Sequence, residues 1–103
     1  MNNIREDSSR VFSTGARRNS SEGKGRYDLI PPCVLKAYAS RCEYGANLHG
    51  DRNWELGIPN DSLFDSAFRH LVQAMNGEED EPHLAACLWN VGMLIYNKEN
   101  NIG

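Results

Sequence analysis

The sequence predicts an all-α domain, a small bundle of about three main helices that follow a long irregular N-terminal arm. Three segments carry apolar residues at helical spacing, and each lies between prolines and glycines. At 103 residues the chain fits one domain, with a single small core of modest stability. We therefore expect oligomerisation to complete the bundle. The predicted organisation is a flexible tail at 1–11, one domain at 12–97 and a C-terminal tail at 98–103.

The N-terminal arm has neither helical nor alternating periodicity. Its stretch FSTGARRNSSEGK, residues 12–24, contains three turn-forming residues, Gly15, Asn19 and Gly23. We therefore expect a loop over these residues. A loop of this length in so small a domain is usually functional or disordered.

The first predicted helix begins at Pro31 or Pro32, since a proline in the first turn loses no hydrogen bond. It should end between Gly45 and Gly50. Glu43 lies at the rim of its apolar stripe, which comprises Val34, Leu35, Tyr38, Ala39, Cys42 and Ala46.

The second predicted helix opens after Pro59, where Asn60 or Asp61 can cap it with a side-chain oxygen, and it ends at Gly77. One face should be apolar, with Leu63, Phe64, Ala67, Phe68, Leu71, Ala74 and Met75. The third predicted helix opens with Asp80 or Glu81 before Pro82. Its sequence HLAACLWNVGMLIY is apolar nearly all round, which is typical of a helix buried on several sides.

Charge and hydropathy exclude several classes of function. The net charge of −3 argues against binding a nucleic-acid polymer along a basic track. No apolar run approaches the length of a membrane span. The N-terminal residues show no hydrophobic stretch after a basic region, so we expect no secretory signal and a cytoplasmic protein without a membrane partner. The three cysteines are scattered, and we expect them to be reduced and structural.

Polar residues interrupt the apolar surfaces of two helices. His83 and Asn90 are seven residues apart and lie on one line of the third helix, while His70 borders the apolar face of the second. Buried polar groups need partners. Hydrogen bonds to neighbouring helices and contact with a ligand both satisfy this need.

The loop GDRNWELG, residues 50–57, offers a guanidinium, an amide and an indole side by side. Arg52 can hold phosphate in two places, Asn53 can read a base edge, and Trp54 can either stack on a base or plug the core beneath the loop. Lys24 and Arg26, beside glycines in the arm, are further anion-binding candidates. No GxxxxGK(S/T) or GxGxxG motif is present, which excludes parallel-sheet nucleotide folds.

Carboxylates near helix rims and ends could hold magnesium, which prefers oxygen ligands. The candidates are Glu43, Asp65, Asp80, Glu81 and Glu78. Their spacing is weak support, because within a helix none of these candidates lies three or four residues from another.

The ordered motifs FSTGARR, EGKGRYDLIPP, EYGANLHGDRNWELGIP, FDSAFRHL and DEPHLAACLWN resemble a known family. It is the dATP/dGTP diphosphohydrolase N-terminal domain family of small phage and bacterial proteins, relatives of the MazG-like all-α nucleoside triphosphate pyrophosphohydrolases. The resemblance covers residues 12–96. It implies magnesium-dependent cleavage of a purine deoxynucleoside triphosphate, dATP or dGTP, to the monophosphate and pyrophosphate.

Carried over position by position, the resemblance implies three roles. Glu43, Asp65 and Asp80 would hold metal or handle water, and Lys24, Arg26 and Arg52 would bind phosphate. The pocket would be shaped by Asn53, Trp54, His70, His83 and Asn90. MazG-like enzymes carry paired acids on two helices, whereas the first helix here has only Glu43. The alternative is therefore a non-catalytic phage-type protein that binds and sequesters a nucleotide or a cyclic dinucleotide.

Overall fold

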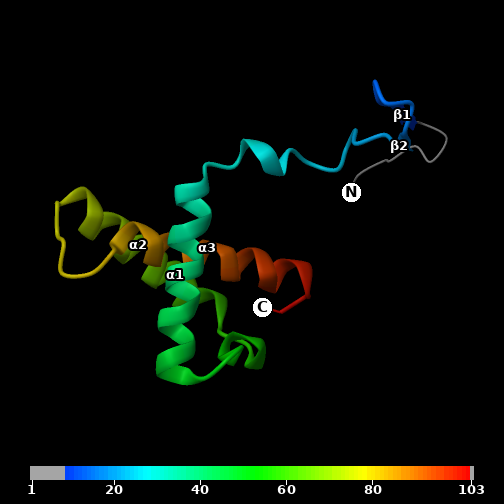
Figure 1. The fold of residues 1–103 in the computed structure, drawn as a ribbon. Helices are drawn as coiled ribbons and strands as arrows, with labels where there is room; N and C mark the ends of the chain where they lie inside the picture. Colours follow the sequence, from blue (N-terminus) through cyan, green and yellow to red (C-terminus); the bar gives the residue numbers. More distant parts are fainter. Residues whose placement is uncertain (1–8, 103) are drawn as a thin grey trace. The chain divides into compact units, whose positions relative to one another are not determined.

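A computed structural model describes residues 9–102 of the chain (Figure 1). The chain divides at Pro31 and Pro32 into an N-terminal arm and a helical unit, and each is described by itself. The helical unit contains α1 (Pro32–His49), a 3-10 turn η2 (Asn53–Leu56), α2 (Asn60–Met75) and α3 (His83–Glu99). The predicted all-α class with three main helices is confirmed. Within the described residues, no helix has the length and apolar character needed to cross a membrane.

The arm contains a short β-hairpin where we expected a loop. Strand β1 (Ser9–Val11) pairs antiparallel with β2 (Arg17–Asn19), with Arg10 opposite Arg18. Gly15 closes the turn with a φ of 90°, and its N–H donates to the Phe12 carbonyl at 2.8 Å. Strands of three residues are too short to show alternation, which is why the sequence pattern missed them. A 3-10 turn, η1 (Tyr27–Leu29), follows.

The expected flexible tail at 1–11 lies mostly outside the described residues. Ser9–Val11, its described part, forms β1. At the other end, α3 continues through Glu99, and the N–H of Ile102 donates to the carbonyl of Asn97 at 2.7 Å.

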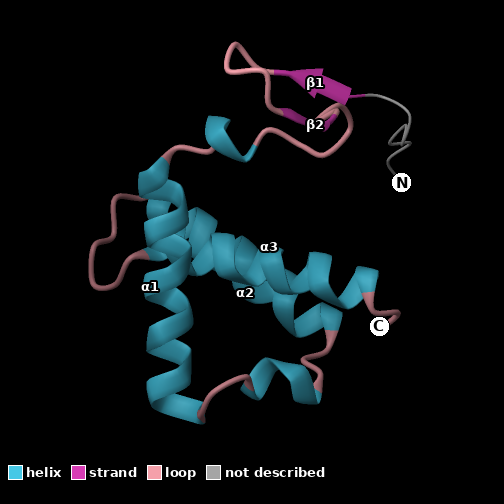
Figure 2. Ribbon diagram, turned by 45° about the vertical axis from the view of Figure 1, so that its right-hand side comes forward, coloured by secondary structure: helices cyan, strands magenta, loops and turns pink. Residues whose placement is uncertain are grey.

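Helix α1 begins at Pro32, as predicted, and ends at His49. The N–H of Gly50 donates to the carbonyl of Ala46 at 2.8 Å, and the positive φ of Gly50, 92°, turns the chain out of the helix. Helices α2 and α3 lie antiparallel and side by side, and α1 crosses them steeply (Figure 2). Thus α3 packs against both other helices.

The seam between α2 and α3 is unusually polar. Leu63, Ala67, Ala86 and Met93 are its buried apolar residues. Buried among them are polar side chains from both helices, namely His70, His83, Asn90 and Asn97. We call this set of buried polar residues, together with Asn60, the polar seam.

The start of α2 corrects a prediction about capping. The N-cap position is Pro59, and no side chain caps the helix. Asn60 instead accepts a hydrogen bond from the Asn97 amide at 2.8 Å, and Asp61 accepts one from the N–H of Ser62 at 3.0 Å. The Asn60 oxygen therefore joins two helices instead of closing one.

Much of the predicted apolar surface is exposed in the single chain. On α2, Phe64 and Phe68 are 63% and 71% exposed, while His70 takes a buried place that we had put at the border. On α3, Leu84, Val91 and Ile95 are also exposed, so this helix is not buried on several sides as we expected. The polar seam occupies the side of α2 that faces α3 and the side of α3 that faces α2. These larger apolar residues therefore lie on the outer sides.

Tyr38 of α1 crosses α3 at Gly92. A Cβ added to Gly92 would overlap the phenol ring of Tyr38. Glycine at this position therefore lets the two helices approach closely. Burial in this contact raises the pKa of Tyr38.

We predict that Gly92→Ala destabilises the protein by about 1–3 kcal/mol, because overpacking of this contact outweighs the gain in helix propensity. Urea unfolding would measure it. Gly45→Ala is the matched control, since the space at that position of α1 is open. There alanine should stabilise by about 0.5–1 kcal/mol. Equal stability of the two variants would contradict close packing of Tyr38 on Gly92.

Candidate functional site

The loop between α1 and α2 is anchored on the last turns of α3. The Trp54 ring meets the Tyr96 ring edge-on, with centroids 4.8 Å apart. The Asn97 amide donates to the carbonyl of Ile58 at 2.9 Å as well as to Asn60. These contacts fix both the middle and the end of the loop.

A cavity of about 230 Å³ opens between this loop and helices α1 and α3. We call it the loop cavity. Arg52, Asn53 and Trp54, the three residues singled out in the sequence, all line it. The remaining lining residues are Cys42, Gly45, Ala46, His49, Gly50, Ile58 and Trp89.

Arg52 has a strained backbone. Its φ of 56° and ψ of 30° place it in the left-handed region, which residues other than glycine rarely occupy. Such strain is often found at functional positions. The neighbouring glycines, Gly50 and Gly57, also have positive φ angles, so the whole loop is built from unusual backbone geometry.

Trp89 contributes a buried indole N–H to this region. Within the described residues it has no hydrogen-bond partner. Trp89 lines the loop cavity and also a smaller cavity of about 170 Å³, with which the loop cavity shares Gly45 and His49. A buried donor without a partner calls for an explanation, and a ligand in either cavity would provide one.

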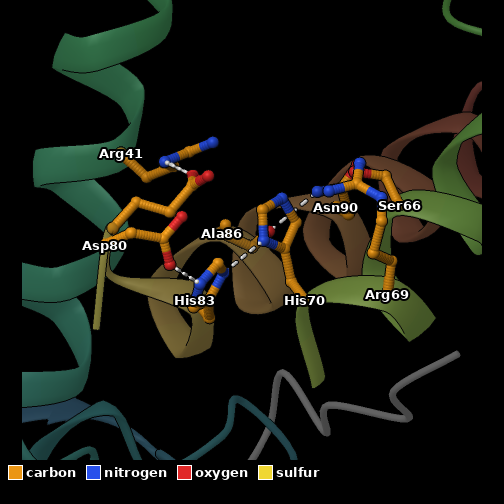
Figure 3. Close-up of polar contacts among 9 residues, drawn as sticks. Arg41, Ser66, Arg69, His70, Asp80, His83, Ala86 and Asn90 are labelled. Atoms are coloured by element: carbon orange, nitrogen blue, oxygen red, sulfur yellow. Dashed lines mark hydrogen bonds and ion pairs between the residues drawn. The ribbon is translucent and has the colours of Figure 1, made fainter. Parts of the chain in front are cut away.

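A second group of polar side chains lies where α2 meets the start of α3 (Figure 3). The Nδ1 atoms of His70 and His83 are 2.9 Å apart, and Nε2 of His83 lies 2.7 Å from Oδ1 of Asp80. Glu81 joins them and accepts a hydrogen bond from Arg41 of α1 at 3.3 Å. We call His70, Asp80, Glu81 and His83 the histidine cluster.

Burial and hydrogen bonding shift two pKa values in this cluster. Burial lowers the pKa of His70 below its ordinary value of 6.5, against the opposing effect of Glu81. The hydrogen bond from His83 lowers the pKa of the Asp80 carboxyl. At neutral pH Asp80 is therefore a carboxylate that accepts the Nε2 proton of His83.

Asn90 is satisfied locally. Its amide donates to the carbonyl of Ala86, one turn earlier in α3, at 2.8 Å. This is neither of the two partners that we considered, a neighbouring helix or a ligand. Asn90 also lines the smaller cavity, so its side chain can still contact a bound molecule there.

The structure groups only some of the predicted site residues. Glu43 and Asp65 are exposed on α1 and α2. Two groups of metal-binding side chains have ligand atoms within 4.8 Å of one another in the described part of the chain: His70 with Glu81 and His83, and Glu78 with Asp80 and His83. Neither contains Glu43 or Asp65. Asp80 therefore belongs to one of these groups, whereas Glu43 and Asp65 belong to neither, and the predicted magnesium role of the three acids stays a prediction.

The two predicted phosphate ligands of the arm belong to the other unit. Lys24 and Arg26 are both exposed. Arg26 forms a two-point pair with Asp28, at 2.9 and 2.8 Å, which raises the pKa of Arg26 and lowers that of Asp28. The predicted roles of Lys24 and Arg26 stay predictions.

Sequence reasoning missed three residues of these sites. His49 and Trp89 line both cavities, and Arg41 binds Glu81 across 40 positions of sequence. Trp89 could have been suspected from its place beside Asn90. Arg41 gave no such signal, because its partner becomes a neighbour only when α1 packs against α3.

We predict that stability falls as the pH is lowered from 7 to 5. Folded His70 resists protonation, whereas the unfolded chain binds the proton near pH 6.5, so the contribution of neutral His70 is complete above that pH and is lost below it. Urea unfolding at each pH gives the free energy of unfolding and its slope against pH. His70→Gln should make this slope smaller, and an unchanged slope in this variant would contradict the lowered pKa. His49→Gln, at an exposed histidine, is the matched control.

The comparisons with known proteins add one finding to this geometry. The family model described as "dATP/dGTP diphosphohydrolase, N-terminal" matches residues 14–103. Neither the curated proteins nor the solved structures give a match. The match covers the hairpin turn, the loop cavity, the histidine cluster and all three helices. The chain therefore belongs to the dATP/dGTP diphosphohydrolase N-terminal domain family.

Proposed function

We propose that this protein is a nucleotide hydrolase that binds a purine deoxynucleoside triphosphate, dATP or dGTP, and cleaves it to the monophosphate and pyrophosphate. Family membership supports the hydrolase class. The observation that carries the proposal is the loop cavity, where Arg52, Asn53 and Trp54 converge with Trp89.

The lining of the loop cavity suits a nucleotide. A guanidinium can bind phosphate with two hydrogen bonds, and an amide can pair with a base edge. The half-buried Trp54 rests edge-on against Tyr96, which holds its ring in place beside the cavity. The indole N–H of Trp89 is a further donor in need of an acceptor.

The volume of the loop cavity limits what it can enclose. At about 230 Å³ it is smaller than the roughly 300 Å³ at the lower end of typical small-molecule sites. It therefore accommodates one part of a nucleoside triphosphate. The adjoining cavity at Trp89 and His49 offers further space for the rest.

A second function is favoured by the separation of the acids. Because Glu43 and Asp65 lie outside both groups of metal-binding side chains, a single chain can hold a nucleotide without the means to cleave it. In this alternative the protein sequesters a nucleotide or a cyclic dinucleotide. Hydrolysis with the magnesium implied by the resemblance would require acids from different chains to meet.

We also propose that a second copy of the chain covers the exposed apolar surface of α2 and α3. This apolar face is formed by Phe64, Phe68, Leu71, Cys87, Val91 and Leu94, which line a shallow cavity together with Ala67. Few apolar residues are buried in one chain, and large aromatic residues exposed together mark interaction sites. Two antiparallel helix pairs stacked on this face would form a four-helix bundle.

We predict that Arg52→Gly leaves the fold intact but abolishes nucleotide binding. Glycine tolerates the left-handed backbone at this position, so stability should stay within about 1 kcal/mol, while the guanidinium is lost. The protein is incubated with each deoxynucleoside triphosphate and with cyclic and linear dinucleotides, with and without magnesium. Pyrophosphate release and melting temperature are followed together. Arg69→Ala, on the exposed side of α2, controls for loss of positive charge without placing a glycine inside a helix.

The two functions give different outcomes in this assay. The hydrolase is supported if the wild type releases pyrophosphate from dATP or dGTP and Glu43→Gln does not. A raised melting temperature with intact ligand recovered after denaturation supports sequestration, because a ligand that binds only the folded state stabilises it. If no nucleotide changes either readout, or if Arg52→Gly binds as the wild type does, the loop cavity is not a nucleotide site.

We predict that Phe68→Glu converts the assembly to monomers, since a carboxylate on the apolar face would be buried without a partner. Light scattering after size-exclusion chromatography gives the mass. Leu56→Glu, at an exposed apolar position of η2, should leave the mass unchanged. A wild-type protein that is monomeric at micromolar concentration would contradict the proposed interface.

A further inference from the structure

We propose that the histidine cluster is a binding site for a divalent transition metal of the zinc class, with Nδ1 of His70, Nδ1 of His83 and a carboxylate oxygen of Glu81 as its ligands. Asp80 positions His83 without binding the metal. This inference does not depend on the proposed nucleotide function. It concerns neither the loop cavity nor the acids Glu43 and Asp65.

The ligand atoms already converge. Those of His70, Glu81 and His83 lie within 4.8 Å of one another, and the two Nδ1 atoms are 2.9 Å apart. Two nitrogens bound tetrahedrally to zinc, each at about 2.0–2.1 Å, are separated by about 3.3 Å. The rings therefore need to part by a few tenths of an ångström and to tilt, so that both Nδ1 lone pairs point at one ion instead of at each other. Both histidines are almost fully buried, with 4% and 2% exposure, so their rings are held in place by packing.

Asp80 prepares His83 for this role. Its carboxylate accepts a proton from Nε2 of His83 at 2.7 Å, which leaves the lone pair on Nδ1 directed at His70. A carboxylate that orients a histidine in this way is the usual outer partner of a zinc-binding imidazole. Without a metal, the same lone pair accepts the Nδ1 proton of His70. The metal would replace that proton.

The donor set distinguishes between classes of metal. Imidazole nitrogens suit zinc, cobalt and nickel, whereas magnesium prefers an octahedron of oxygens. Two imidazoles and one carboxylate form the three-ligand pattern that leaves zinc a fourth position. The other group, Glu78 with Asp80 and His83, offers two exposed acids and one histidine, and it would use Asp80 as a ligand instead of a positioning residue.

The charge around the site is also favourable. Two cations, Arg69 and Arg41, act on His70. Arg41 donates to Oε1 of Glu81 at 3.3 Å, and its guanidinium also lies over the Tyr44 ring. The carboxylates of Asp80 and Glu81, both within the cluster, offset these positive charges. A bound cation would tie α2 to the start of α3 and to the acidic loop between them.

The test uses the full-length protein, stripped with a chelator and titrated with zinc or with cobalt as a coloured substitute. We expect one metal per chain, a raised melting temperature, and cobalt bands without the thiolate charge-transfer absorption that cysteine ligands would produce. Glu81→Gln should weaken zinc binding at least about 10-fold, and Asp80→Asn about 10- to 100-fold. His83→Asn should abolish it.

Controls separate this site from adventitious binding. His49→Asn and Glu79→Gln make the same chemical changes at exposed positions outside the cluster, and both should bind zinc like the wild type. If His83→Asn fails to fold by circular dichroism, Glu81→Gln and Asp80→Asn decide, since both side chains lie at the rim. The proposal would be overturned if Glu81→Gln and Asp80→Asn bind zinc as tightly as the wild type. Loss of zinc binding in the control variants, or a thiolate band with cobalt, would also overturn it.

Discussion

The hydrogen-bonded polar seam between α2 and α3 is the constraint on which the rest of the structure depends. At one end His70 faces His83, and at the other the Asn97 amide binds Asn60 and the carbonyl of Ile58. Each of these groups would be costly to bury alone, so the pairing fixes both the register and the antiparallel direction of the two helices. An apolar seam would tolerate sliding, whereas this one does not.

The same constraint explains why so much apolar surface lies outside. Because the inner stripes of α2 and α3 carry histidines and asparagines, Phe64, Phe68 and Ile95 must point elsewhere. The specific hydrogen-bonded contacts therefore lie inside one subunit, and much of its hydrophobic area lies on the surface. This arrangement suits a small helical domain that gains more of its core by assembly with a second copy, the state that we propose here.

The sequence predicted the helices well, because proline and glycine mark their ends and the apolar spacing marks their lengths. It could not predict which side of α2 faces α3, since Phe68 and His70 are both reasonable core residues until the partner helix is known. Asn60 was predicted as a cap for a similar reason: the local rule ignores Asn97, which lies 37 residues away and competes for the same oxygen.

The candidate sites were predicted unevenly. The RNW element was found because its residues are adjacent in sequence, and they line one cavity together. The pairing of His70 with His83 required the fold, although both residues had been singled out. The acids Glu43, Asp65 and Asp80 were candidates from their places near helix rims and ends, and the resemblance gave them their metal role; only Asp80 belongs to a group of converging ligand atoms.

The anchoring of the loop on α3 makes the order of the loop depend on the last turns of that helix. Tyr96 and Asn97 hold Trp54 and Ile58, so the stiffness of the segment that carries Arg52 is set by the final turns of a helix remote from it in sequence. Fraying of those turns would release the loop while leaving the histidine cluster intact. Order at the C-terminal end of α3 is thereby coupled to the shape of the loop cavity.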